Sequence, residues 1–111
     1  MYVRYVHIAR HPWGANVLFE WDERKRQANL AKHHIDFQDA RRVFDGPVFE
    51  TVDSRLGEDR VVAIGLIEGI EIVVVYVMRG KRRRIISARR AHRNERQDYA
   101  NHIEGADQGK D

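Results

Sequence analysis

The chain has no cysteine among its 111 residues. Disulfide bonds, thiolate metal sites and a cysteine nucleophile are therefore excluded, and a reducing compartment fits this composition. A long apolar run is also missing, since the longest, Ile70–Met78, is interrupted by Glu71 and is far shorter than the roughly 18 to 20 residues of a membrane helix. The N-terminal residues have neither the apolar stretch nor the cleavage site of a secretory signal. We therefore expect a cytoplasmic protein that makes no contact with a membrane.

Metal-binding patterns are missing as well. The acidic residues form no cluster at metal-ligand spacing, and the histidines form no recognisable metal motif. These histidines are His7, His11, His33, His34, His92 and His102. We expect no metal ion and no other cofactor.

Positive charge is present in abundance, and it is concentrated in one segment. Residues 79–93 read RGKRRRIISARRAHR, with eight Lys or Arg and no acid, although the net charge of the chain is only +3. Such a density of cations indicates a polyanionic partner, and nucleic acid is the first candidate. Ile85 and Ile86 lie within the segment, which indicates that it belongs to a fold and is not a disordered tail.

The hydrophobic pattern predicts one α+β domain. Asp22 and Asp36 are good N-caps, and each precedes a segment with helical spacing. The buried stripe predicted for the first helix contains Trp21, Ala28, Ala31 and Ile35. Later segments alternate with a period of two, and short turns make neighbouring strands antiparallel. The expected strands are 18–21, 48–53, 60–67, 70–78 and 82–87, and the expected helices begin near residues 23, 37 and 91.

The last expected helix, residues 91–103, has a carboxylate on its apolar side. At 100° per residue, Glu95 shares a face with Ala88, Ala91 and Tyr99, whereas Arg89 lies on another face. A lone buried charge is very costly. We therefore expect a structural pair between Glu95 and an arginine, and a chemical role for Glu95 is the alternative.

Several short motifs follow one another in a specific order. They are FEWD (19–22), NLAKH (29–33), FQDARRVF (37–44), EDR (58–60), IISARRA (85–91) and ERQDY (95–99). In order and spacing they resemble BrnT, a family of small bacterial ribonuclease toxins of type II toxin–antitoxin pairs. The resemblance covers residues 18–103 as one domain, with 1–17 as an N-terminal extension whose order the sequence leaves open and 104–111 as a polar tail.

The resemblance implies a RelE-like α+β fold, with two N-terminal helices, an antiparallel sheet of four to five strands and a C-terminal helix. It implies an endoribonuclease that arrests growth by cutting RNA. It also implies a ribbon-helix-helix antitoxin as partner, with operator DNA bound only through that antitoxin.

Metal-independent cleavage suits this chain because RNA supplies its own nucleophile, the 2′-OH. The enzyme must remove that proton, stabilise the phosphorane and protonate the leaving 5′-oxygen. Arginine forks match phosphate oxygens and stay charged. The candidate catalytic residues are His33 and Glu58 as general bases, with Arg79 and Arg84 as phosphate clamps. The candidate RNA-binding residues are Lys32, Arg60, Ser87, Arg89 and Arg90.

Each candidate also has a structural explanation. Lys32 and His33 end a helix, where the macrodipole favours cations. Glu58 and Arg60 can be a solvated charge pair, and Ser87 can cap the last helix. The family often has Gly where this chain has His34, and Thr where it has Val77. Two other functions therefore stay open: a non-catalytic nucleic-acid-binding module, and a degenerate toxin that acts as an antitoxin-binding corepressor.

Overall fold

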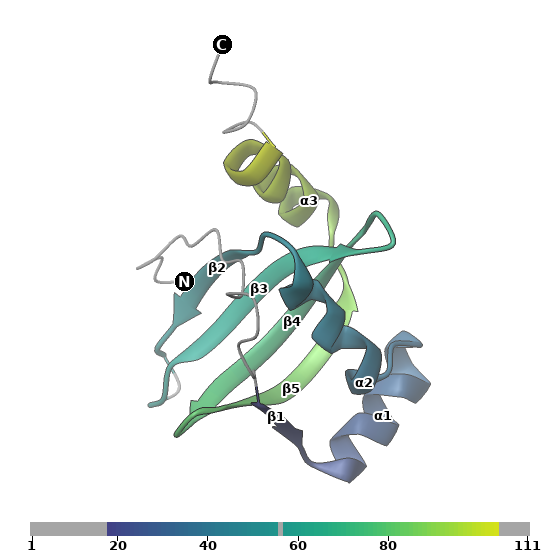
Figure 1. The fold of residues 1–111 in the computed structure, drawn as a ribbon, viewed down its shortest axis with the longest axis vertical. Helices are drawn as coiled ribbons and strands as arrows, with labels where there is room; N and C mark the ends of the chain where they lie inside the picture. The colour runs from purple at the N-terminus through teal and green to yellow at the C-terminus, as the bar shows by residue number, and fades with distance from the viewer. Residues whose placement is uncertain (1–17, 56, 105–111) are drawn as a thin grey trace.

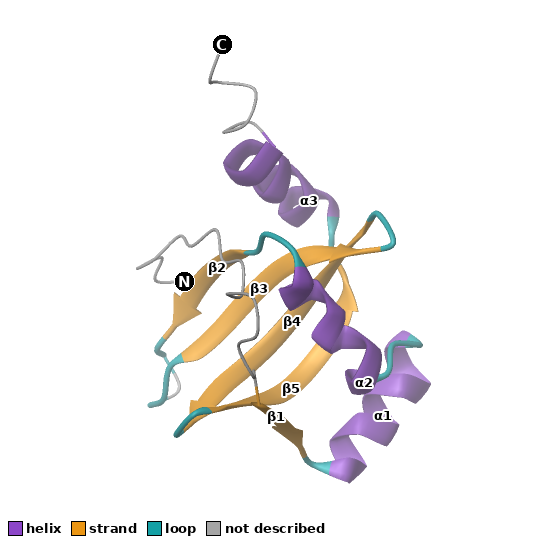
Figure 2. Cartoon of the chain, viewed as in Figure 1, coloured by secondary structure: helices purple, strands orange, loops and turns teal. Residues whose placement is uncertain are grey.

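The computed structural model describes residues 18–55 and 57–104, which form a twisted sheet with helices on both sides (Figures 1 and 2). The expected N-terminal extension and nearly all of the expected polar tail lie outside these residues. The described elements are β1 (Leu18–Trp21), α1 (Glu23–His33), α2 (Phe37–Ala40), the 3₁₀ helix η1 (Arg41–Asp45), β2 (Phe49–Asp53), β3 (Arg60–Ile67), β4 (Ile70–Arg79), β5 (Arg82–Arg90), α3 (Arg93–Tyr99) and the π-helical turn η2 (Ala100–Glu104). The expected α+β class is confirmed.

Within the described residues the sheet has five strands, in the order β1-β5-β4-β3-β2. Strands β2 to β5 are antiparallel neighbours, whereas β1 pairs with β5 in parallel, from Leu18 opposite Arg82 to Trp21 opposite Ile85. The expectation of a purely antiparallel sheet was therefore wrong at β1. Tight turns at Gly69 and Gly80, both with positive φ, force β3, β4 and β5 to alternate in direction. No tight turn joins β1 to β5, so the chain is free to place them parallel.

The two faces of the sheet carry separate cores. On one face, α2 and η1 supply the buried residues that the sequence predicted for this segment. They are Phe37, Ala40, Val43 and Phe44. On the other face, Tyr99 of α3 packs with Phe49, Ile64 and Val73. Each layer removes apolar surface from water, which is the main favourable term in folding.

Helix α1 lies beside β5 and is held there by a polar residue. Asp22 caps its first turn by accepting hydrogen bonds from the backbone N–H groups of Arg24 and Lys25. Asn29 is only 7 % exposed. Its amide donates to the backbone oxygens of Ile35 and Ala88, at 3.0 and 2.8 Å, and accepts from the N–H of Ala88 at 3.1 Å. The apolar stripe expected for α1 was wrong at Ala28 and Ala31, which are exposed, whereas Trp21 and Ile35 pack against the core.

Strand β5 is longer than the sequence predicted, because it continues past Ser87 to Arg90. Its pairing with β4 shifts by one residue, since Val75 lies opposite Ser87 and Tyr76 opposite Ile85, which leaves Ile86 as a β-bulge. The bulge interrupts the period of two, so the end of the strand was mistaken for the start of the helix. Helix α3 begins at Arg93, and Arg89 belongs to the strand.

Candidate functional site

Basic residues of β5 lie on both faces of the sheet. Val73, on the face that α3 covers, pairs with Arg89, and alternate residues of a strand share a face. The β5 residues on this face, which we call the basic row, are Arg82, Arg84, Ser87 and Arg89. The β5 residues on the opposite face are Arg83, Ile85, Ala88 and Arg90. The segment that looked like one basic cluster is therefore divided into two.

The guanidinium of Arg83 packs against aromatic rings on the opposite face of the sheet. It lies 4.8 Å from the ring centroid of Phe44 and 5.4 Å from that of Tyr76. The hydroxyl of Tyr76 donates a hydrogen bond to the buried carboxylate of Glu50 at 2.6 Å, and burial is the first cause that raises the pKa of Tyr76. Arg83 therefore packs against core side chains and is not part of the basic row.

Carboxylates hold the arginines that the sequence assigned to phosphate. Arg84 Nη1 lies 2.7 Å from Glu20 of β1, and Arg89 makes hydrogen bonds of 2.8 Å to both carboxylate oxygens of Glu95. Arg79 Nη1, in the next strand, lies 2.6 Å from Glu58. The Arg79–Glu58 pair is exposed, and exposed pairs contribute little to stability and are screened by salt, whereas the Arg84–Glu20 and Arg89–Glu95 pairs are partly buried. A phosphate group, which offers the same fork of acceptors, can therefore replace the carboxylate.

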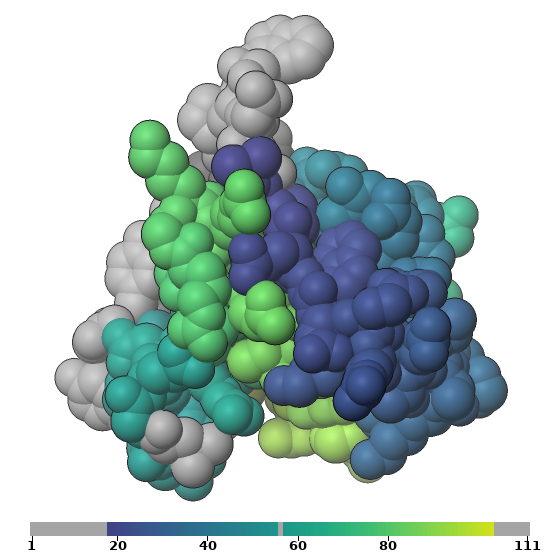
Figure 3. Space-filling view, turned by 90° about the horizontal axis from the view of Figure 1, so that it is seen from below, coloured from purple at the N-terminus to yellow at the C-terminus, as the bar shows by residue number. Residues whose placement is uncertain are grey.

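A hollow of about 310 Å³ lies between α1 and β5. Lys32 and His33 line it from α1, Ser87 and Ile86 line it from β5, and Asn29 lies between them. We call it the α1–β5 hollow. Its walls come from α1 and β5, which are far apart in the sequence; the space-filling view shows purple residues from the start of the described chain beside green residues from its later part (Figure 3). The bulge at Ile86 and the hydrogen bonds of Asn29 set the spacing between these walls.

The electrostatics of the hollow act on His33. Partial burial is the first cause that lowers the pKa of His33 below its ordinary value of 6.5, and the positive charges of Lys32 and Arg89 lower it further. The imidazole is therefore neutral at neutral pH, with one ring nitrogen free to accept a proton. A neutral base surrounded by cations is suited to deprotonate a group bonded close to an anion.

Glu58 and Arg79 lie elsewhere. Val73 pairs with Arg89 and Arg79 pairs with Arg82, so the two ends of the row are separated by six residues of β4, or about 20 Å. Glu58 pairs with Arg79 at the far end, where the hydrogen bond from Arg79 is the first cause that lowers the pKa of Glu58. The charge of Arg60 lowers it further. The structure therefore does not bring the two candidate bases together: His33 shares the hollow with Lys32 and Ser87, whereas Glu58 stays with Arg79 and Arg60.

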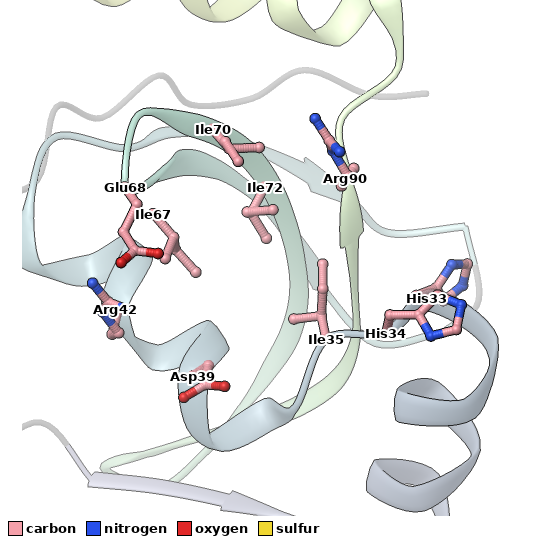
Figure 4. A pocket seen from close by; sticks show the side chains of 10 residues that line it. All are labelled: His33, His34, Ile35, Asp39, Arg42, Ile67, Glu68, Ile70, Ile72 and Arg90. Atoms are coloured by element: carbon pink, nitrogen blue, oxygen red, sulfur yellow. The ribbon is translucent and has the colours of Figure 1, made fainter.

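Arg90 lines a larger pocket on the opposite face, with a volume of about 510 Å³ (Figure 4). We call it the isoleucine pocket, because Ile35, Ile67, Ile70 and Ile72 supply its apolar lining. His33 and His34 line one side of it. Of the pocket's polar residues, only Arg90 and His33 were among the candidates that the sequence indicated. The isoleucines come from distant segments and belong to no motif.

Two further observations limit what the described residues can hold. Across residues 18–55 and 57–104, no group of three or more His, Cys, Asp or Glu side chains is placed to bind a metal ion. In the same part of the chain, no helix has the length and hydropathy needed to cross a membrane.

Comparison with protein families identifies the family of this chain. A family described as "Ribonuclease toxin, BrnT, of type II toxin-antitoxin system" matches residues 21–95. A search of curated proteins finds no match. The matched residues include both walls of the α1–β5 hollow and the whole of the sheet except its first residues.

Proposed function

We propose that this chain, which belongs to the BrnT family of ribonuclease toxins of type II toxin–antitoxin systems, cleaves RNA without a metal ion, by attack of the RNA's own 2′-OH. The observation that carries the proposal is the neutral His33 in a hollow beside Lys32 and Ser87. RNA bears a phosphate and a hydroxyl on adjacent atoms, and this hollow offers a base and cations at the same place.

His33 acts as the general base in this mechanism. Its free ring nitrogen takes the 2′-OH proton as the 2′-oxygen attacks phosphorus. Lys32 and Arg89 stabilise the charge that grows on the phosphorane oxygens. The bond from phosphorus to the 5′-oxygen then breaks, and Lys32 donates a proton to that oxygen. The products are a 2′,3′-cyclic phosphate and a 5′-hydroxyl, and DNA is spared because it has no 2′-OH.

Glu58 is the weaker candidate for the base. The hydrogen bond from Arg79 lowers the pKa of Glu58, and a carboxylate of lower pKa is a poorer proton acceptor. Its partner Arg79 also lies four residues along β4 from Val75, which pairs with Ser87 of the hollow, or about 13 Å. We assign Arg79, Arg84 and Arg60 to the RNA backbone on either side of the cleaved bond, where Arg79 and Arg84 each exchange a carboxylate partner for phosphate.

Further parts of the proposal rest on the family. The α+β sheet with helices before and after it supports a RelE-like fold. A ribbon-helix-helix antitoxin would neutralise the toxin in the cytoplasm and would carry the contacts to operator DNA. An acidic antitoxin segment laid along the basic row would block RNA, because both partners use the same arginines.

The test is cleavage of RNA by the purified protein in EDTA, with His33→Gln as the variant and His102→Gln as the control. His102 is exposed and lies after α3, remote from the hollow. The wild-type rate should rise with pH through the lowered pKa of His33, below 6.5, and should level off above it. We expect His33→Gln to lose 10²- to 10⁴-fold in rate, roughly the contribution of a general base, and to lose that rising limb.

Other outcomes would support the alternative functions. Binding of RNA and DNA with steep salt dependence and no cleavage products would indicate a nucleic-acid-binding module. An antitoxin complex that represses its operator, formed by a protein that neither cleaves RNA nor arrests growth, would indicate a degenerate toxin.

A further inference from the structure

The isoleucine pocket combines an apolar lining with exposed polar groups at its rim. Ile67 and Ile70 end the two strands of the β3–β4 hairpin, and Ile72 follows on β4. Ile70 is 41 % exposed. In Figure 4, Ile35 and Ile72 point into the space between the hairpin and α2. Ile35 and Ile67 are half-buried, and Ile72 is buried. One exposed hydrophobic residue is ordinary, but apolar side chains that gather around one pocket indicate a ligand with apolar faces.

The rim of the pocket supplies both kinds of hydrogen-bonding group. Arg42 and Arg90 are donors, whereas Asp39 and Glu68 are acceptors. Arg79, Arg84 and Arg89 are all held by carboxylates, but within the described residues the guanidinium of Arg90 makes no ion pair. A ligand that fits has flat apolar faces, an edge with donors and acceptors, and an attached negative charge.

The pocket and the α1–β5 hollow share one lining residue. His33 lines both. A nucleotide whose phosphate lies against Lys32 and Ser87 therefore has its neighbour on the other side of His33, at the entrance of the isoleucine pocket. Arg90 stands on that side, where its guanidinium can donate hydrogen bonds to the edge of that nucleotide's base.

The backbone around this pocket is unusual. Within the described residues, the non-glycine residues with positive φ are His34, at 61°, and Glu68, at 52°. Both line the isoleucine pocket. His34 is the C-cap of α1, and Glu68 lies in the turn between β3 and β4, so the left-handed conformation, which costs such residues about 1 to 2 kcal/mol, fixes the backbone at two sides of the pocket.

We propose that the isoleucine pocket is a base-binding subsite, which holds a nucleobase of the RNA next to the cleaved phosphate and sets the sequence preference of cleavage. This rests on the proposed ribonuclease function. The isoleucines contact the faces of the base, and the rim groups read its edge. A volume of about 510 Å³ falls within the roughly 300 to 1,000 Å³ of small-ligand pockets, whereas a docked antitoxin helix would need an extended groove.

The first experiment measures binding of 2′-O-methyl oligonucleotides, each made of a single base, because these cannot be cleaved by 2′-OH attack. The wild type should prefer one base. Ile70→Ser and Arg90→Gln should each reduce that preference by roughly tenfold, as expected for the loss of stacking or an edge contact. Leu66→Ser is the matched control, since Leu66 is 38 % exposed and Ile70 41 %. Leu66 precedes Ile67 on β3 and faces the other side of the sheet.

The second experiment maps the cut sites of each variant on a pool of RNA with all sequences. The subsite is supported when Ile70→Ser and Arg90→Gln still cleave but lose the base preference beside the cut, while Leu66→Ser keeps it. Unchanged preference in both variants overturns the subsite and leaves the ribonuclease in place. Loss of antitoxin neutralisation with unchanged preference also overturns it, and assigns the pocket to the antitoxin. If the wild type cleaves nothing but its base-selective binding depends on Ile70 and Arg90, the ribonuclease function fails and the subsite stands.

Discussion

Replacing Asn29 with alanine should destabilise the fold by about 3 kcal/mol. The side chain makes three hydrogen bonds to backbone groups of the described chain, one to Ile35 and two to Ala88, and each is worth about 1 kcal/mol net. Ala88 lies beyond the part of β5 that pairs with β1. Asn29 therefore takes the place of a neighbouring strand at this edge, and its loss leaves buried backbone groups without partners.

Urea unfolding followed by circular dichroism measures this free energy directly. A loss of 3 kcal/mol should also lower Tm by roughly 10 to 20 °C in a domain of this size. Asn94→Ala is the control, because Asn94 is exposed in α3 and such changes stay within about 0.5 kcal/mol.

Asn29→Leu separates hydrogen bonding from packing, since leucine restores the volume and no polar atom. We expect Asn29→Leu to be as unstable as Asn29→Ala. A loss below about 1 kcal/mol for the alanine variant, or a leucine variant as stable as the wild type, would refute the assignment of the three hydrogen bonds. Because Asn29 also spaces the walls of the α1–β5 hollow, RNA cleavage should fall in both variants at temperatures where they remain folded.

Three other changes have defined outcomes. Gly65→Ala should cost about 1 to 3 kcal/mol in urea unfolding, because the new Cβ would lie 2.9 Å from Cβ and 3.0 Å from the backbone oxygen of Val43; a neutral effect would contradict this close approach. His34→Gly should add about 1 kcal/mol of stability, since glycine adopts the left-handed conformation without strain, and a lower Tm would contradict it. Glu95→Gln should lose about 1 kcal/mol at pH 7, a value already reduced for solvent screening. The hydrogen bond from Arg89 lowers the pKa of Glu95, so this stability is present above the unfolded value of 4.5 and disappears as the pH falls through the lowered pKa; an unchanged acid limb in Glu95→Gln would contradict the assignment.

Local chemistry was sufficient to predict most of the elements. Asp22 and Asp36 cap α1 and α2 as expected, because an N-cap acts on backbone groups two or three residues away. The turns around Gly69 and Gly80 likewise predicted the antiparallel meander. The signals that succeeded are those in which cause and effect lie within a few residues.

Three features required the folded chain. The parallel pairing of β1 with β5 follows from no turn between them, so no local signal predicts it. Helix α1 is held by the polar Asn29, whereas the sequence predicted an apolar stripe. The bulge at Ile86 shifts the later half of β5 and places Arg89 and Arg90 on opposite faces. No pattern in the sequence indicates that extra residue.

The candidate site was predicted in composition but not in geometry. The family resemblance pointed to His33 and Glu58 as alternative bases, and their roles stay predictions. The sequence does not predict the distance between His33 and Glu58. It also does not predict the pairing of Arg84 with Glu20, because these two residues meet only when β1 and β5 come together.

The parallel contact between β1 and β5 also bears on how the toxin is made. Leu18 pairs with Arg82, and Lys32 and His33 form the hollow together with Ser87. During synthesis, the hollow therefore cannot form until β5 has left the ribosome. Contacts so far apart in the chain also form late in folding. A nascent chain that stops before β5 therefore lacks one wall of the hollow.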